Sequence, residues 1–86
     1  MKAVNYYLYV YDSIIMKNMQ NQSKLGNNIK KYRAKLGLTQ EDLVKKSSVK
    51  YTTLSKIESG VIKMPSVQIV AKIAKALGVS IEDLIK

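Results

Sequence analysis

Apolar residues return at the three- and four-residue spacing of an amphipathic helix along most of the chain. The first such set shares one helical face and comprises Leu25, Ile29, Tyr32 and Leu36. Ser23 precedes the set and can cap the helix start, and Gly37 follows it with the freedom to adopt the left-handed conformation that ends many helices. We therefore expect a first helix over about residues 24–36, with this face buried.

A capping pattern predicts a second, short helix. Thr39 is followed three residues later by Asp42, so that the Thr hydroxyl and the carboxylate can bind free amides at a helix start. The helix then covers about residues 40–46, and Ser47 and Ser48 break the pattern.

A third helix is expected directly after this break. Leu54 and Ile57 share one face of the segment 51–59, and Gly60 ends it. The chain from Thr39 to Gly60 therefore predicts a helix, a tight turn and another helix.

Two further helices complete the pattern after a loop. Ser66 can cap the fourth helix and Gly78 closes it. The buried face of this helix is predicted at offsets of zero, three, four and seven, which are Val70, Ile73, Ala74 and Leu77. Ser80 and Asp83 repeat the capping pattern for a last turn over residues 81–85.

Residues 1–22 differ in kind from the rest of the chain. The run NYYLYVY near its start is rich in strand-favouring residues and lacks helical spacing, which favours a short strand. The segment is either an ordered arm that pairs or packs, for instance on a second protomer, or a disordered leader ahead of Met16 or Met19; we favour the ordered arm. Asn5 and Asp12 interrupt an apolar stretch already too short for a bilayer, so no membrane segment is expected.

These elements predict an all-α class, with one compact five-helix domain over residues 23–86 and a Tyr-rich N-terminal arm over residues 1–22. A chain of 86 residues leaves no comfortable room for a second domain. It contains no Cys and no His, which removes the common metal sites, disulfides, thiol nucleophiles and imidazole bases. We therefore expect no enzyme activity, no metal and no cofactor. Nothing at the N-terminus resembles a good signal peptide, so the sequence predicts a cytoplasmic protein.

The charge of the chain points to a polyanionic partner. Lys and Arg number 15 against 6 Asp and Glu, for a formal net charge of +9. Most of this surplus lies in the predicted domain, where neutralised phosphates would release counterions and supply affinity for nucleic acid. The alternative is a solvated, lysine-rich surface without such a partner, and charge alone does not separate the two.

A family resemblance begins at residues 39–65, which read TQEDLVKKSSVKYTTLSKIESGVIKMP. This stretch resembles the DNA-binding core of the phage-repressor and Cro-like helix-turn-helix family. The flanking segments are similar to the first, fourth and fifth helices of that five-helix domain, so the resemblance covers about residues 23–86 and not the Tyr-rich segment. Residues of several different types stand at the spacing that is typical of the family. They are Arg33, Thr39, Gln40, Leu43, Leu54, Ile57, Glu58, Gly60, Pro65, the run IAKALGVS and Leu84.

The resemblance implies double-stranded DNA as the partner, with the second helix over the sugar-phosphate backbone and the third in the major groove. It also implies an ion pair between Arg33 and Glu58, although Arg33 could instead contact DNA directly. Contacts with the DNA sugar-phosphate backbone are implied for Thr39, Gln40, Ser59 and Lys63. Base-reading positions are implied for Tyr51, Thr52 and Lys56, with Lys50, Thr53 and Ser55 beside them. The plain alternative for these residues is a set of solvated side chains at helix starts and in a loop.

Three positions depart from the family pattern. Relatives usually have Ala at the position of Val44, an apolar residue at Ser47 and Gly at Ser48. A Ser in the left-handed conformation costs about 1 kcal/mol relative to Gly, and Val44 must pack where two helices cross closely. These departures bear on the angle between the helices, and so on the register of base contacts.

The function that follows is sequence-specific binding of an inverted-repeat operator by a homodimeric transcriptional regulator. Relatives commonly dimerise near the C-terminal region, where the apolar face is expected to be mainly core and in part interface; it comprises Val70, Ile73, Leu77, Ile81 and Leu84. The alternative function is that of an antitoxin, which binds a small protein partner through an arm and represses its own operon.

Overall fold

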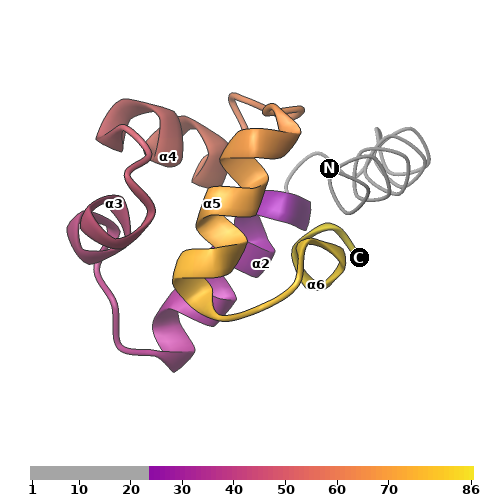
Figure 1. Cartoon of the computed structure of the whole chain (residues 1–86). Coiled ribbons are helices and arrows are strands. Elements are labelled where there is room, and N and C mark those ends of the chain that lie inside the picture. Colours follow the sequence, from indigo (N-terminus) through magenta and orange to yellow (C-terminus); the bar gives the residue numbers. More distant parts are fainter. Residues whose placement is uncertain (1–23) are drawn as a thin grey trace.

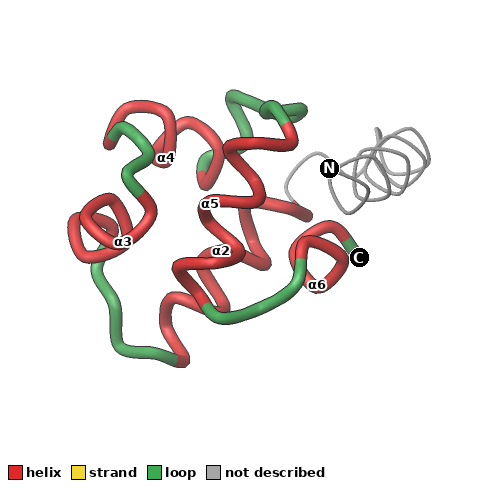
Figure 2. Tube along the Cα trace, viewed as in Figure 1, coloured by secondary structure: helices red, strands yellow, loops and turns green. Residues whose placement is uncertain are grey.

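The computed structural model of the chain describes residues 24–86, which fold into five helices (Figure 1). They are α2 (Lys24–Lys35), α3 (Gln40–Ser47), α4 (Tyr51–Glu58), α5 (Val67–Leu77) and α6 (Ile81–Ile85). Figure 2 shows helices and loops and no strand in this part of the chain. The prediction of an all-α, five-helix domain is confirmed for these residues. The predicted Tyr-rich arm, with its strand and its role toward a partner, lies outside the described residues.

Helix α5 occupies the centre of the domain. It packs against α2, α3 and α6, while α4 packs against α2 and α3 (Figure 1). The apolar core lies between these helices, and its largest fully buried side chains are Ile29, Leu43, Leu54, Ile57, Val70, Ile73 and Leu84. The face predicted for α5, from Val70 to Leu77, is buried as expected.

Local capping explains where most of these helices begin. The Thr39 hydroxyl oxygen accepts a hydrogen bond from Asp42 N, and the Asp42 carboxylate accepts one from Thr39 N, both at 3.0 Å. Ser80 and Asp83 make the same reciprocal pair at the start of α6. Ser66 accepts a hydrogen bond from the backbone of α5. These three predicted caps are confirmed, which explains why such short helices have defined starts, while the predicted cap at Ser23 lies outside the described residues.

The end of α2 differs from the prediction. The helix stops at Lys35, and Leu36 lies in the following turn with 53% of its surface exposed, so its predicted place on the buried face is wrong. Gly37 has a φ of +67°, the left-handed conformation that was expected to end the helix. Because that turn redirects the backbone directly after Lys35, Leu36 leaves the face shared by Leu25 and Ile29.

Gly26 permits the close crossing of α2 and α4. A Cβ atom at this position would lie 2.5 Å from Ile57 O and 2.9 Å from Glu58 O, which is closer than real Cβ atoms come. The backbone of α2 therefore rests directly on the last turn of α4.

The last helix is tied to the first by a side chain. Asn28 donates a hydrogen bond from Nδ2 to Leu84 O at 2.7 Å, across 56 residues of sequence. Carbonyl groups at a helix end lack partners within the helix, so this bond satisfies one of them. Among residues 24–86, no helix combines the length and apolar character needed to cross a membrane.

Candidate nucleic-acid interface

The outer face of α4 carries the polar positions that the sequence singled out. Residues at three- and four-residue spacing share a helical face, and the exposed or half-exposed members here are Tyr51, Thr52, Ser55, Lys56 and Ser59. The opposite face holds Leu54 and Ile57, which are fully buried. No acidic side chain stands on the outer face, since the single acid of α4, Glu58, is buried. This face is therefore free to meet an anionic surface.

The start of α4 has no side-chain cap. Lys50 occupies the N-cap position with extended backbone and makes no side-chain capping bond, because an ammonium group cannot accept from the helix amides. Thr53, in the first turn, is half-exposed. The first amides of α4 are thus left to solvent or to an external acceptor, and the positive end of the helix favours a negative one.

A loop returns along the end of α4 and carries another cation. Ile62 N donates a hydrogen bond to Lys56 O at 3.0 Å, which folds the loop back onto the helix. Lys63 follows and is exposed. The Ser59 hydroxyl donates to the same Lys56 carbonyl at 3.2 Å, so its proton is already used in the free protein.

A buried carboxylate organises the other side of the site. Arg33 donates from Nη2 to Glu58 Oε1 at 2.9 Å and from Nε to Oε2 at 3.1 Å, a two-point ion pair between α2 and α4. Glu58 is 4% exposed, and the Arg33 side chain is 20% exposed. Removing Arg33 would leave the buried Glu58 carboxylate without its ion-pair partner, at a cost of about 3–5 kcal/mol.

Two more groups join this pair. Arg33 Nη1 donates to Leu38 O at 3.1 Å, and Gln40 Nε2 donates to Glu58 Oε1 at 3.0 Å. The Glu58 carboxylate therefore links the start of α3 to the ends of α2 and α4. The role of Leu38 was not predicted, because its contribution is a backbone carbonyl and leaves no mark in the side-chain pattern.

Gln40 and Thr39 thus serve the fold in the free protein. The Gln40 amide donates one of its protons to Glu58, and the Thr39 hydroxyl oxygen caps α3. An amide nitrogen has a second proton, and a hydroxyl can still donate its own, so both side chains keep a donor for a phosphate oxygen. Their predicted DNA contacts stay predictions.

Hydrogen bonds also set the charge at the start of α3. The backbone N–H of Thr39 lowers the pKa of the Asp42 carboxyl below its ordinary value, with further help from the Thr39 hydroxyl and from Lys45 and Lys46. Asp42 therefore stays ionised to a lower pH than a free Asp, in the position that the helix dipole favours.

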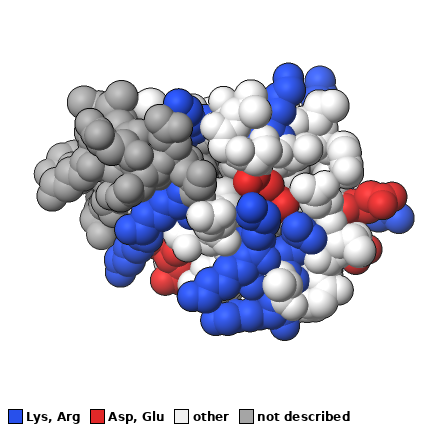
Figure 3. All heavy atoms as spheres, turned by 180° about the vertical axis from the view of Figure 1, so that it is seen from behind, with Lys and Arg blue, Asp and Glu red and all other residues white. Residues whose placement is uncertain are grey.

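Basic side chains outnumber acidic ones in the composition, and they also gather on the surface. Helix α2 carries five cations and no acid: Lys24, Lys30, Lys31, Arg33 and Lys35. Seen from behind, where α2 lies in front of α5, Lys and Arg atoms gather over the lower centre of the described surface and acidic atoms are scattered (Figure 3). The positive field is therefore not confined to α4.

The tight turn between α3 and α4 adopts the conformation that the Ser48 position requires. Ser48 has a φ of +62°, in the left-handed region, and its N–H donates to Val44 O at 2.9 Å. Ser47 is buried, and its hydroxyl oxygen accepts from Val49 N at 3.2 Å. Val44 is half-buried against the core. The three departures from the family pattern are thus accommodated within an intact helix-turn-helix.

The apolar face of α5 and α6, which was expected to be mainly core and in part interface, is core within the protomer. Its five side chains are all at most 5% exposed, so they offer little surface to a second protomer, and the dimer stays a prediction. Large exposed apolar side chains do occur elsewhere in the described chain, and two of them, Val61 at 70% and Met64 at 53%, lie in the loop after α4.

No group of three metal-binding side chains occurs among residues 24–86. The described chain does hold a basic groove that the sequence reading missed, between the end of α3 and the second half of α5. Its signal was the pair Lys72 and Lys75, spaced three apart on the solvent side of a helix whose other face is apolar. That spacing alone does not reveal which element lies opposite.

Comparison with known proteins gives one family. The family model described as helix-turn-helix matches residues 29–84. A protein of Methanocaldococcus jannaschii, described as an uncharacterized HTH-type transcriptional regulator, is 50% identical over 58 residues, which is 67% of this chain and 86% of that protein. Two proteins of Archaeoglobus fulgidus with the same description are 43% and 39% identical over 56 residues, 65% of this chain and 79% and 78% of theirs. No solved structure gives a significant match.

Proposed function

The chain belongs to the helix-turn-helix family of phage-repressor and Cro-like type, and from this membership we propose that it is a transcriptional regulator that reads double-stranded DNA with α4. The observation that carries the proposal is the outer face of α4, which is exposed, polar, free of acids and backed by a fully buried core. A helix of this kind fits the major groove, where base edges present donors and acceptors. The relatives described as transcriptional regulators support this function and suggest no enzyme activity.

Base reading is assigned to the exposed middle of this face. Lys56 is a donor suited to guanine O6 and N7, and Thr52 can hydrogen-bond a base edge or contact a thymine methyl group. Tyr51 is half-exposed at the start of α4, where its ring can lie on a sugar or its hydroxyl can reach a phosphate. Thr53 and Ser55 are less exposed neighbours and adjust this contact.

Contacts with the DNA sugar-phosphate backbone are assigned to residues on the rim of the site. Thr39 and Gln40 stand at the start of α3, Lys50 at the uncapped start of α4, and Ser59 and Lys63 at its end. In this contact the Ser59 hydroxyl exchanges its bond to Lys56 O for one to a phosphate oxygen. Such contacts fix the register of the protein on the duplex without carrying sequence information.

We further propose that the regulator acts as a homodimer on an inverted repeat. Val61 and Met64 support the loop after α4 as its surface, because large apolar side chains at 70% and 53% exposure gain from burial against a second copy. A contact at this loop would bring two α4 helices near each other, as half-sites about 34 Å apart require.

The test is selection of random duplex DNA by the full chain at about 150 mM salt, where weak electrostatic binding is suppressed. The expected result is an enriched inverted repeat with half-sites about one helical turn apart. Enrichment of a single half-site would remove the dimer and keep DNA reading. No enrichment of any sequence would overturn the proposal.

Two substitutions separate base reading from backbone contact. We expect Lys56→Ala to relax the preference at one base position, with a loss of roughly 1–3 kcal/mol on the selected site. Gln40→Ala should weaken binding to selected and random duplexes alike. Fluorescence anisotropy on both duplexes measures this, with Lys86→Ala as a control for loss of one positive charge. Equal losses on both duplexes for Lys56→Ala would remove that residue from the base readers.

A further inference from the structure

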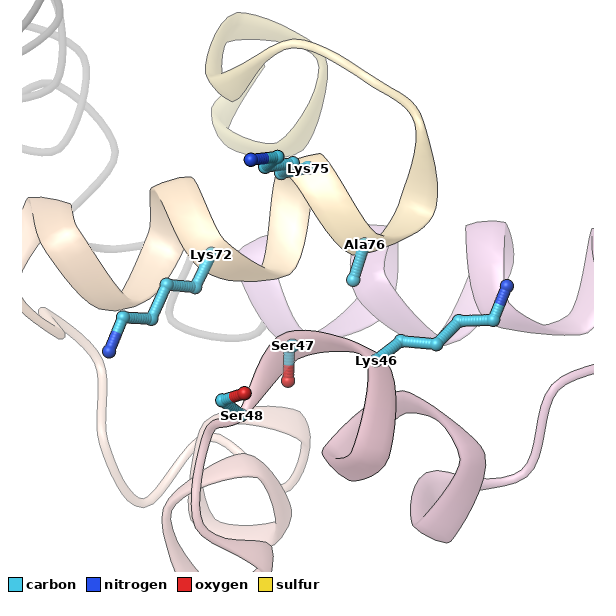
Figure 4. A pocket seen from close by; sticks show the side chains of 6 residues that line it. All are labelled: Lys46, Ser47, Ser48, Lys72, Lys75 and Ala76. Carbon is cyan, nitrogen blue, oxygen red and sulfur yellow. The ribbon is translucent and has the colours of Figure 1, made fainter.

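A basic groove lies between the end of α3 and the second half of α5 (Figure 4). It is lined by Lys46, Ser47, Ser48, Lys72, Lys75 and Ala76. The three lysines are exposed, the lining includes no acid, and the small side chains of Ser47 and Ala76 leave room between the two helices. The α4 helix contributes no lining residue, so this groove is a surface separate from the proposed DNA-reading face.

Helix dipoles account for part of this arrangement. Lys46 and Lys75 stand in the last turns of α3 and α5, where a cation compensates the negative helix end. Lys72 lies in the middle of α5 and gains nothing from that effect. Helix dipoles therefore explain two of the three lysines and leave Lys72 unexplained.

Ser48 provides a second, independent observation. It is the single non-glycine residue with positive φ in the described chain, and the hydroxyl it brings to the groove makes no hydrogen bond within residues 24–86. A glycine would hold this turn without strain. Strained backbone positions cluster at functional sites, and here the strained residue brings a hydroxyl donor among three cations.

The spacing of the charges identifies the class of occupant. In Figure 4, Lys46 and Lys72 extend to opposite sides of the groove, so the ammonium groups do not converge on a single small anion. Charges spread along an open groove suit several carboxylates on one chain. We propose that this groove docks an acidic segment of a partner protein, with Lys46, Lys72 and Lys75 pairing with its Asp or Glu side chains and Ser48 donating a hydrogen bond.

This docking surface goes beyond DNA reading, and the two are compatible on one protomer. The groove is formed by the end of α3 and by α5, whereas the proposed DNA-reading face belongs to α4 and to a rim that includes the opposite end of α3. An acidic partner could therefore bind while α4 occupies the major groove, and the failure of either proposal would leave the other standing.

The experiment uses the ¹⁵N-labelled full chain and a hexaglutamate peptide, with hexaglutamine as the neutral probe. We expect hexaglutamate to shift the amide signals of Ser47, Ser48 and Ala76, and hexaglutamine to leave them in place. The triple variant Lys46→Ala, Lys72→Ala and Lys75→Ala should bind the acidic peptide about tenfold more weakly, since three exposed ion pairs are lost.

The matched control removes the same charge from α2, through Lys24→Ala, Lys31→Ala and Lys35→Ala. This variant should bind hexaglutamate within about twofold of the wild-type affinity, because charges on α2 act on the groove only at long range, where salt screens them. Equal losses in the two triple variants, or shifts spread over all basic helices, would overturn the proposal.

A further variant keeps every charge and tests the hydroxyl. Ser48→Gly should weaken hexaglutamate binding by about twofold to tenfold, the value of one hydrogen bond, while the spectrum elsewhere stays unchanged. A random duplex serves as the last arm. If the duplex shifts the groove amides, and the groove variant loses more DNA affinity than the α2 control, then the groove is a DNA surface and the docking proposal fails.

Discussion

Ser48 combines an unfavourable backbone conformation with a side chain that makes no internal hydrogen bond among residues 24–86. We expect Ser48→Gly to raise the free energy of unfolding by roughly 0.5–1 kcal/mol, because relief of the left-handed strain exceeds the entropy that glycine adds to the unfolded chain. Urea unfolding followed by circular dichroism measures this. Ser55→Gly is the matched control, which should destabilise the protein because it lies inside α4. A loss of stability in Ser48→Gly would contradict the argument.

Asp42 links stability to pH through its capping box. Its pKa is lower in the folded protein than its ordinary value of 3.8, chiefly because of the bond from Thr39 N. A depressed folded pKa stabilises the protein above the unfolded pKa, and that contribution is lost as pH falls through the folded value. We therefore expect wild type to lose stability below about pH 4 more steeply than Asp42→Asn.

Thermal unfolding between pH 6 and pH 2 tests this expectation. The difference in Tm between the two proteins should shrink as the pH falls, because the wild-type carboxyl becomes protonated and resembles the amide. Asp83→Asn, in the matching box of α6, provides the comparison at the other end of the domain. A gap that stays constant with pH would show that the ionised carboxylate is not what matters.

The crossing of α2 and α4 depends on the absence of one side chain. A Cβ at Gly26 would meet the carbonyls of Ile57 and Glu58, which are backbone atoms and cannot move aside cheaply. We expect Gly26→Ala to destabilise the protein by roughly 1–3 kcal/mol, although alanine is the better helix former. Asn27→Ala, exposed on the same helix, should be neutral or slightly stabilising in the same denaturant experiment. A stable Gly26→Ala protein would mean that the helices can separate.

Sequence reasoning succeeded for these helices where the causes are local. The capping boxes at Thr39 and Ser80 need two residues three apart, and both are visible in the chain. Leu36 was placed on the wrong side because its exposure depends on where the turn at Gly37 redirects the backbone. From the sequence alone, Gly26 is only a weak helix former. Its role in the close crossing becomes visible once the position of α4 is known.

In the candidate site, too, sequence patterns predict local features and miss contacts between distant helices. The Arg33 and Glu58 pair lies 25 residues apart in sequence, and it was reached by family resemblance and not by spacing. The Gln40 bond to the same carboxylate and the groove between α3 and α5 both require knowing which helices are neighbours. Tertiary packing therefore decides what the local patterns cannot.

The domain as a whole spreads its positive charge over several surfaces. Cations stand on α2, on the α3–α5 groove and around α4, while two of the five acids among residues 24–86 are used in capping boxes and a third, Glu58, is buried against Arg33. Net charge thus attracts DNA from any direction, and orientation must come from direct contacts. The salt dependence of binding distinguishes long-range attraction from direct contact. The slope of log K against log salt concentration reports how many phosphates the protein neutralises in contact.

We accordingly expect the slope of log K against log salt concentration to separate the surfaces. Lys50→Ala with Lys63→Ala, on the rim of α4, should reduce the slope on the selected duplex by about 2, one for each lost phosphate contact. The variant of the three groove lysines removes more charge, yet it should leave the slope unchanged within about 0.5, because at moderate salt its charges are screened beyond roughly 8–10 Å. Anisotropy titrations from about 50 to 200 mM salt give the slopes. A larger change in the groove variant than in the rim variant would mean that α5 and not α4 faces the duplex.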